Sequence, residues 1–361
     1  MSGCPDDEPC FDPIQRLEIE GGIPGERWRT GDVDGDGRED LVGMEETQAG
    51  VWRLYPFLGS IDAPPFEIAP TVDIDTGMSL TGATTRLLDA NGDGVIDIAA
   101  FHDGSIVIVD GPLLDGASIR PYSVAELSAG RGEFIDFDDD GIIDFIMREG
   151  FGDNLVSLRG LPEGGFEEAN TAEFDEGTWC INRFVTYEAG DADWVGAEAT
   201  RSCGASVDTP VRISLFSIEA DGAFAEVAST EWQIELFDSG ITLRAAGNFL
   251  GDAQPELYIN SSIRGAQGGV LEELDSTPDG LRGDFNGDGI IDHAYERRDG
   301  TLIEYDLGGE VSVDPSLRLY WDVSSPADLL TALDVDGDGA DEMLALQGDA
   351  IVVGGAVADC R

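Results

Sequence analysis

Short apolar segments alternate with acidic and glycine-containing segments along the whole chain. An acidic loop is followed by a β-type run, a turn with glycine and a second run, as in DIAAF, HDGS and IVIVD over residues 97–110. The same order returns in DHAYE, RRDG, TLIEY and in DEMLAL, QGD, AIVVGG. Apolar and β-branched residues on either side of Gly-Asp turns are typical of hairpins, and stretches with helical period are scarce. We therefore expect an all-β protein built from small antiparallel sheets.

The acidic loop occurs six times and defines a repeat. Its copies are separated by 57, 47, 36 and 50 residues, with one gap of 112 residues between Asp136 and Asn248. That gap is about two periods long, so it predicts a decayed copy, and YEAGDADWVGAEA around Glu188 fits the register. The chain therefore contains seven repeats. The six recognisable copies start at Asp32, Asp89, Asp136, Asn248, Asp284 and Asp334.

Repeats of this length, each forming a small sheet, are typical of a β-propeller, in which neighbouring blades cover one another's faces. The last repeat ends one strand short, while IQRLEIE (14–20) precedes the first loop without a sheet of its own. We expect this run to complete the final blade as its outer strand. The short spacing after Asn248 predicts a blade that lacks its outer strand. The prediction is a tail at 1–12 and, at 13–361, a single seven-bladed β-propeller domain with three- to four-stranded antiparallel blades.

Five copies of the loop are intact, with oxygen-bearing side chains at positions 1, 3, 5 and 9 and glycine at position 6. Carboxylates held so close together repel one another unless they share a hard cation. Oxygen ligands favour Ca²⁺ over Zn²⁺ or Cu²⁺, and the stricter octahedral geometry of Mg²⁺ disfavours that ion. For one loop taken alone, a solvated Asp-Gly turn is the alternative. We expect about five Ca²⁺ sites and none in the copies at Asn248 and Glu188. The predicted side-chain ligands are Asp32, Asp34, Asp36, Asp40; Asp89, Asn91, Asp93, Asp97; Asp136, Asp138, Asp140, Asp144; Asp284, Asn286, Asp288, Asp292; and Asp334, Asp336, Asp338, Glu342, joined by the backbone carbonyls of Arg38, Val95, Ile142, Ile290 and Ala340.

The five cysteines fit the same register. Closure by the N-terminal strand puts Cys10 beside Cys360, and the antiparallel pair in the decayed repeat brings Cys180 and Cys203 together. These two predicted disulfides indicate an oxidising compartment, with free thiols in a cytosolic protein as the alternative. The remaining Cys4 follows Ser-Gly, as at the end of a bacterial lipobox. A lipid anchor at Cys4 and an ordinary N-terminal tail both stay open.

The charge balance limits the class of partner. The chain has 74 acidic residues against 20 basic ones, all of them arginine, for a net charge of −54. Such a field disfavours nucleic acid and anionic membranes as partners. No run reaches the roughly 18 apolar residues that span a bilayer. We expect a soluble monomer without a transmembrane segment.

The segments GDFNGDGIID, LDANGDGVID and GDVDGDGRED resemble the FG-GAP/VCBS repeats of bacterial surface proteins and of the integrin α-subunit propeller. The resemblance covers the chain from Ile14 onward. It implies a seven-bladed propeller that carries calcium in hairpin loops on one face and serves adhesion or ligand binding.

We therefore expect a non-enzymatic, calcium-stabilised module at the cell surface or outside the cell that recognises a protein or glycan. The alternative is a calcium-dependent polysaccharide lyase or hydrolase. The only histidines are His102, at a hairpin turn, and His293, beside a predicted ligand, and no GxSxG motif is present. These features favour binding over catalysis.

Overall fold

The part of the chain that the structure describes is all β. In the computed structural model every regular element in the described ranges is a strand, so no helix there is long and apolar enough to cross a membrane. The described residues are 15–18, 27–60, 66–114, 117–123, 132–149, 154–162, 164–173, 179–189, 192–201, 210–233, 243–247, 255–260, 262–276, 281–284, 292–296, 302–306, 320–322, 328–335, 341–347 and 350–354.

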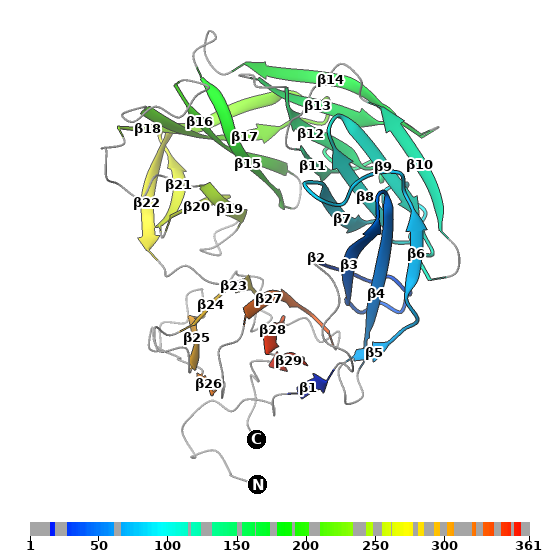
Figure 1. The fold of residues 1–361 in the computed structure, drawn as a ribbon. Helices are drawn as coiled ribbons and strands as arrows, with labels where there is room; N and C mark the ends of the chain where they lie inside the picture. Colours follow the sequence, from blue (N-terminus) through cyan, green and yellow to red (C-terminus); the bar gives the residue numbers. More distant parts are fainter. Residues whose placement is uncertain are drawn as a thin grey trace.

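These strands form seven antiparallel sheets, which follow one another around a ring in Figure 1. Each sheet takes consecutive strands as neighbours, apart from the last, which the N-terminal strand joins. The first three sheets are β2 (Arg27–Gly31), β3 (Asp40–Gln48), β4 (Val51–Gly59) and β5 (Phe66–Ile68), with β6 (Val72–Asp75) also on β4; β7 (Thr84–Leu88), β8 (Asp97–His102), β9 (Ser105–Asp110) and β10 (Ser118–Ser123); and β11 (Gly132–Ile135), β12 (Asp144–Arg148), β13 (Asn154–Gly160) and β14 (Phe166–Glu173).

The next three sheets repeat this plan over the middle of the chain. They are β15 (Cys180–Ala189), β16 (Ala192–Thr200), β17 (Pro210–Ile218) and β18 (Phe224–Gln233); β19 (Leu243–Gly247), β20 (Glu256–Ile259), β21 (Ser262–Gln267) and β22 (Val270–Ser276); and β23 (Leu281–Gly283), β24 (Asp292–Glu296), β25 (Leu302–Asp306) and β26 (Tyr320–Asp322).

The last sheet joins the two ends of the chain. β27 (Asp328–Leu333), β28 (Glu342–Gln347) and β29 (Ala350–Gly354) are followed by β1 (Gln15–Glu18), which pairs antiparallel with β29. In this register Gln15 lies opposite Val353 and Glu18 opposite Ala350. Residues 15–18 of the run IQRLEIE therefore form the outer strand of the last sheet, the place that the sequence predicts for this run.

The two sheets around the decayed copies depart from the common plan in different ways. The prediction that the sheet after Asn248 lacks an outer strand is wrong, because β22 occupies that place. The short spacing reflects a four-residue β20 and tight connections from β20 to β21 and from β21 to β22 rather than a missing strand. In the fourth sheet β15 and β16 pair up to Ala189 opposite Ala192, so a tight hairpin replaces the nine-residue loop there.

The core lies between neighbouring sheets. Val42 and Trp52 of the first sheet pack with Ile98 and Val109 of the second, while alternate residues of the second sheet face the third, where the rings of Phe101 and Phe145 are 4.8 Å apart. Sheets buried on both faces require nearly continuous apolar strands, which explains runs such as IVIV.

The first and last sheets also pack together. Leu41, Phe57 and Phe66 form one cluster with Leu344 and Ile351, which belong to the last sheet. Segments from opposite ends of the sequence therefore share an apolar core, and Figure 1 shows β1 and β29 beside β5.

Candidate metal centre

Three intact loops lie entirely within the described residues, and each joins the first two strands of its sheet. Residues 32–40 connect β2 to β3, residues 89–97 connect β7 to β8, and residues 136–144 connect β11 to β12. The position-1 aspartate sits at the centre of each loop. Asp32, for example, accepts hydrogen bonds from the backbone N–H groups of Gly35 at 2.7 Å and Gly37 at 2.8 Å. The chain is thereby wrapped around a carboxylate.

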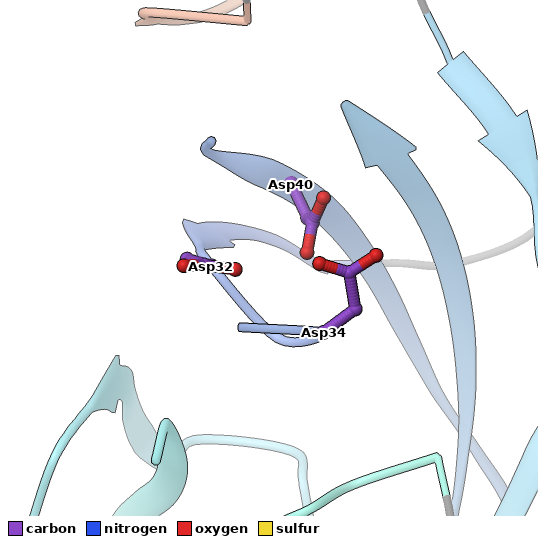
Figure 2. A group of neighbouring side chains, drawn as sticks. All are labelled: Asp32, Asp34 and Asp40. Atoms are coloured by element: carbon purple, nitrogen blue, oxygen red, sulfur yellow. The ribbon is translucent and has the colours of Figure 1, made fainter. Parts of the chain in front are cut away.

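Carboxylates at positions 1, 3 and 9 come together in two of these loops. One oxygen from each of Asp32, Asp34 and Asp40 lies within 4.8 Å of the others. Figure 2 shows these three side chains grouped at the end of the strands, with the carboxylates of Asp34 and Asp40 facing one another. The equivalent residues of the third loop form the same group: Asp136, Asp138 and Asp144.

The position-5 aspartates belong to neither group. Asp36, Asp93 and Asp140 each accept the backbone N–H of their own position-7 residue through Oδ1, at 3.0, 2.9 and 2.8 Å. The position-7 residues are Arg38, Val95 and Ile142, whose carbonyls are the predicted backbone ligands. This part of the loop is therefore held by a local turn.

The position-9 aspartate is the most buried member of the loop. Asp40, Asp97 and Asp144 are 0, 0 and 1% exposed. In each, Oδ2 accepts the N–H of position 2, at 2.7, 3.1 and 3.0 Å. The other oxygen, Oδ1, accepts the N–H of a glycine at or just after the end of the third strand, at 2.7 Å in every case.

These glycines, Gly59, Gly111 and Gly160, are functional positions that the sequence motif does not contain. A Cβ on any of them would lie 2.4–2.6 Å from the carbonyl oxygen of the position-8 residue. Only glycine permits that approach. We refer to the contact between the position-9 carboxylate and this glycine as the latch.

Burial disfavours the charged form of the loop carboxylates. It raises the pKa of Asp40 and of Asp97 to about 6 and that of Asp144 to about 7, against the opposing effect of their backbone hydrogen bonds. Burial also raises the pKa values of Asp34 and Asp136, with repulsion from neighbouring aspartates adding to it. A cation among these oxygens would reverse the shifts.

The donor set fits a hard cation. All groups that converge are oxygens, and Oδ1 of Asp138 is buried without a hydrogen-bond partner among the described residues. An orphaned carboxylate oxygen in a group of three carboxylates is the place a Ca²⁺ ion would satisfy.

Two arginines already contact loop carboxylates. Arg38 forms an ion pair with Asp36 of its own loop. Arg159, next to the latch glycine of the third sheet, places Nε 2.8 Å from Oδ2 of Asp138. The second loop has a neutral Asn91 at position 3, and its neighbour Asp110 is paired with Arg120.

The other two predicted sites are described only in part. Glu342 accepts the N–H of Val335 at 2.9 Å, which repeats the bond from position 9 to position 2. Of the loop at 284–292 only Asp284 and Asp292, which begins β24, are described. Of the loop at 334–342 only Asp334, Val335, Asp341 and Glu342 are described. These two ligand sets stay predictions, because Asn286, Asp288, Ile290, Asp336, Asp338 and Ala340 lie outside the described residues.

The cysteine predictions are described for one residue. Cys180, at the start of β15, is disulfide-bonded. Cys4, Cys10, Cys203 and Cys360 lie outside the described residues, so both pairings and the anchor at Cys4 stay predictions.

Neighbouring loops are hydrogen-bonded to one another. The position-8 N–H of one loop donates to a carbonyl at position 1 or 2 of the adjacent loop, as from Ile143 to Ala90 at 3.3 Å and from Asp341 to Asp284 at 2.7 Å. Glu39 of the first loop donates in the same way to Asp334 of the last, at 3.4 Å. These bonds place the loops side by side on one face.

The opposite face carries a pocket of about 410 Å³. β8 runs from its acidic loop to His102, so the turn after His102 is at the far end of the strand. His102 and Ser105 from this turn form one wall, and Met78, from the connection between β6 and β7, forms another with Pro121 of β10. The imidazole lies over Gly82, where an added Cβ would meet Cε1 at 3.1 Å.

No known protein family matches the chain, and no curated protein matches it. Solved structures do resemble it. BBS1N, crystallised in complex with ARL6DN, aligns with a TM-score of 0.56 and 10% identity over 96% of this chain and 98% of that one. A protein from Lactobacillus plantarum aligns with a TM-score of 0.54 and 12% identity over 84% of this chain and 86% of that one. At such identities the likeness concerns the fold alone, and it supports a β-propeller arrangement of the sheets.

Proposed function

We propose that the chain is a closed, seven-bladed β-propeller of the FG-GAP/VCBS type that calcium stiffens and that acts as a binding module. The seven sheets would be its blades, and β1 would close the ring as the outer strand of the last one. Supporting closure, the first and last sheets share an apolar cluster, and Glu39 donates to Asp334 across the junction.

The observation that carries the calcium proposal is the grouping of carboxylates at positions 1, 3 and 9 in two separate loops. In this proposal Asp32, Asp34 and Asp40 hold one ion, and Asp136, Asp138 and Asp144 hold another. The ion offsets the repulsion among buried carboxylates and stiffens the connection between the first two strands. In this proposal the role of the ion is structural, because both oxygens of the position-9 carboxylate already accept hydrogen bonds from the backbone.

The ligand would then bind on the face away from the loops, in the pocket beside His102. The segment between β6 and β7, which lines this pocket, is hydrogen-bonded to the first sheet. The indole N–H of Trp52 donates to the carbonyl of Met78 at 2.7 Å, and Glu46 accepts from the Ser79 hydroxyl at 2.9 Å and from the Leu80 N–H at 3.0 Å. A site formed in advance loses little entropy on binding.

The chemistry of the pocket favours a neutral glycan. None of the described residues that line it is an arginine, so among them an anionic ligand would meet no guanidinium. The exposed Pro121 and the half-buried Tyr122 offer apolar surface for the C–H face of a sugar ring, whereas His102, Asp103 and Ser105 offer hydrogen bonds to its hydroxyl groups. The volume is within the range of about 300–1,000 Å³ typical of small-molecule sites.

An extracellular or cell-surface location belongs to the same proposal. The disulfide at Cys180 supports it, because disulfides persist in oxidising compartments.

Saturation-transfer NMR with a panel of neutral mono- and disaccharides tests the binding site. We expect a signal with the wild type that falls at least tenfold in affinity in His102→Ala and weakens in Asp103→Asn. Asp139→Asn is the matched control, because Asp103 and Asp139 both have left-handed φ values, of 46° and 56°, and Asp139 lies on the loop face. Binding that is equally strong in all variants would place the ligand elsewhere, and turnover of a polysaccharide would favour the lyase or hydrolase alternative.

A further inference from the structure

Counted over the predicted side-chain ligands and the arginine paired with them, the three fully described loops carry the same charge, with Glu39 and Asp139 left out because neither is a predicted ligand. The first loop has four predicted carboxylate ligands and one arginine paired with them, which leaves 4 − 1 = 3 negative charges. The third loop also has four, and Arg159 again leaves 4 − 1 = 3. The second loop has asparagine at position 3 and so has three carboxylates, and its neighbouring Arg120 is paired with Asp110, outside those three.

The position that supplies Arg159 faces its loop in more than one sheet. Arg159 immediately precedes the latch glycine Gly160, and Asp110 stands at the same place before Gly111. Asp110 receives a hydrogen bond from Asn91, the position-3 residue of the second loop, as Arg159 contacts Asp138, the position-3 residue of the third. In these two sheets the residue before the latch glycine therefore contacts position 3 of the loop, whereas the first sheet has the uncharged Leu58 there.

Arg159 is fixed by more than this one carboxylate. Its Nη2 donates to the carbonyl of Ala220 at 2.6 Å, in the turn between β17 and β18 of the next sheet. The guanidinium carbon also lies 6.0 Å from the centre of the Phe137 ring. Arg159 Nε has no aligned hydrogen-bond acceptor among the described residues, so its 2.8 Å contact with Asp138 is an ion pair held by charge rather than by hydrogen-bond geometry.

We propose that Arg159 is a built-in counter-cation that lowers the calcium affinity of the third loop and keeps that loop folded when calcium is absent. This inference rests on the proposed calcium sites. A Ca²⁺ ion bound by Asp138 would lie close to the guanidinium, and the two like charges would repel one another across a partly buried space. Arg159 cannot move away without losing its bond to Ala220, so calcium binding at this loop is linked to the contact between the third and fourth sheets.

Arg159→Gln separates this role from a structural one, because the amide keeps a donor for Ala220 and removes the charge. Arg159→Lys restores the charge, and Arg53→Met is a control. Arg53 forms a similar ion pair with Asp73 at 2.6 Å and is 36% exposed, against 32% for Arg159, but its partner belongs to no loop. Arg159→Met is the second neutral variant, should the glutamine variant fold poorly.

The measurement is calcium titration of the full chain by calorimetry, together with melting curves in EDTA. We expect one site to bind about tenfold more tightly in Arg159→Gln, since ligand charge sets calcium affinity. We expect Arg159→Lys and Arg53→Met to titrate like the wild type. In EDTA, Arg159→Gln should melt below the wild type, so that calcium raises its melting temperature by more.

Two contrary results have different meanings. A wild type that binds several calcium ions, with an Arg159→Gln variant that titrates identically, would contradict this inference alone. A wild type and variants that bind no calcium would contradict the proposed function and the inference together.

Discussion

At the scale of single residues, position 9 of the loop does more than the motif indicates. Its aspartate is a predicted ligand, yet both oxygens already accept backbone hydrogen bonds, as Asp144 does from Phe137 and Gly160. The carboxylate therefore fastens the third strand to the loop whether or not a metal is present. Loss of a ligand and loss of a latch are different defects, although one substitution at position 9 causes both.

The latch can be tested from its glycine side, without touching a ligand. In Gly160→Ala the added Cβ would lie 2.4 Å from the carbonyl oxygen of Ile143 and 2.8 Å from Cγ2 of Ile142. We expect a loss of about 2–3 kcal/mol in the free energy of unfolding, as for other overpacked sites. Urea unfolding in EDTA measures this loss independently of calcium.

Gly269→Ala provides the control for that measurement. Its φ is +85° and its added Cβ meets nothing within 4 Å, so only backbone strain of about 1 kcal/mol is expected. Equal effects of the two substitutions would show that the close approach at Gly160 is not important for stability.

The grouping of the carboxylates at positions 1, 3 and 9 could be predicted from the sequence, and the latch could not. Asp32, Asp34 and Asp40 stand in one contiguous motif, so their convergence follows from a local turn. The latch joins residues 19, 14 and 16 positions apart in the three sheets, because the second and third strands differ in length. A glycine at a variable distance carries no recognisable spacing, and the same holds for Arg159.

At the scale of elements, arginines connect the inner strands of adjacent sheets. An inner edge strand leaves carbonyl groups without a partner strand. Arg29 of β2 donates from Nε to the carbonyl of Thr85 in β7 at 2.7 Å, and Arg183 of β15 donates to Leu243 of β19 at 3.0 Å. Burial, with repulsion from Arg86 and Arg27, lowers the pKa of Arg29 to about 10, so the side chain stays charged at neutral pH.

Removing one of these contacts should weaken the joint between two sheets. Leu243 is buried, its N–H donates to Glu198 at 3.0 Å, and its carbonyl accepts from Arg183. Arg183→Met should leave that carbonyl without the arginine and cost about 1–3 kcal/mol of unfolding free energy. Thermal or urea denaturation in EDTA measures the change.

Arg53→Met is again the comparison, because its ion pair with Asp73 is largely exposed. We expect it to cost about 1 kcal/mol or less. An Arg183→Met variant as stable as Arg53→Met would mean that the contact with Leu243 contributes nothing to the joint.

The order of the strands could be predicted because strand and turn signals alternate strongly along the chain. The number of strands in each sheet could not be predicted. The pattern places IQRLEIE next to the last sheet, where β1 lies. The prediction, from the loop spacing, that the sheet after Asn248 lacks an outer strand is wrong. The spacing between loops measures the total length of a repeat and not its number of strands. β20 is short and its connection to β21, like that from β21 to β22, is tight, which makes room for β22.

At the scale of the whole molecule, the acidic loops and the pocket lie on opposite faces. The loops form a hydrogen-bonded series in which Glu39 of the first contacts Asp334 of the last. The chain as a whole has a net charge of −54, and the carboxylate groups in two of these loops add local repulsion on that face unless cations offset it. In the proposed function, calcium holds the ring together and leaves the other face available for a ligand.

The most direct test is a calcium titration of the EDTA-stripped full chain by calorimetry, paired with melting curves in calcium and in EDTA. We predict several sites, about five, and a clearly higher melting temperature with calcium, because each occupied site stabilises the folded state by mass action. A chain that releases no heat of binding and melts at the same temperature in calcium and in EDTA would contradict the proposed role of calcium.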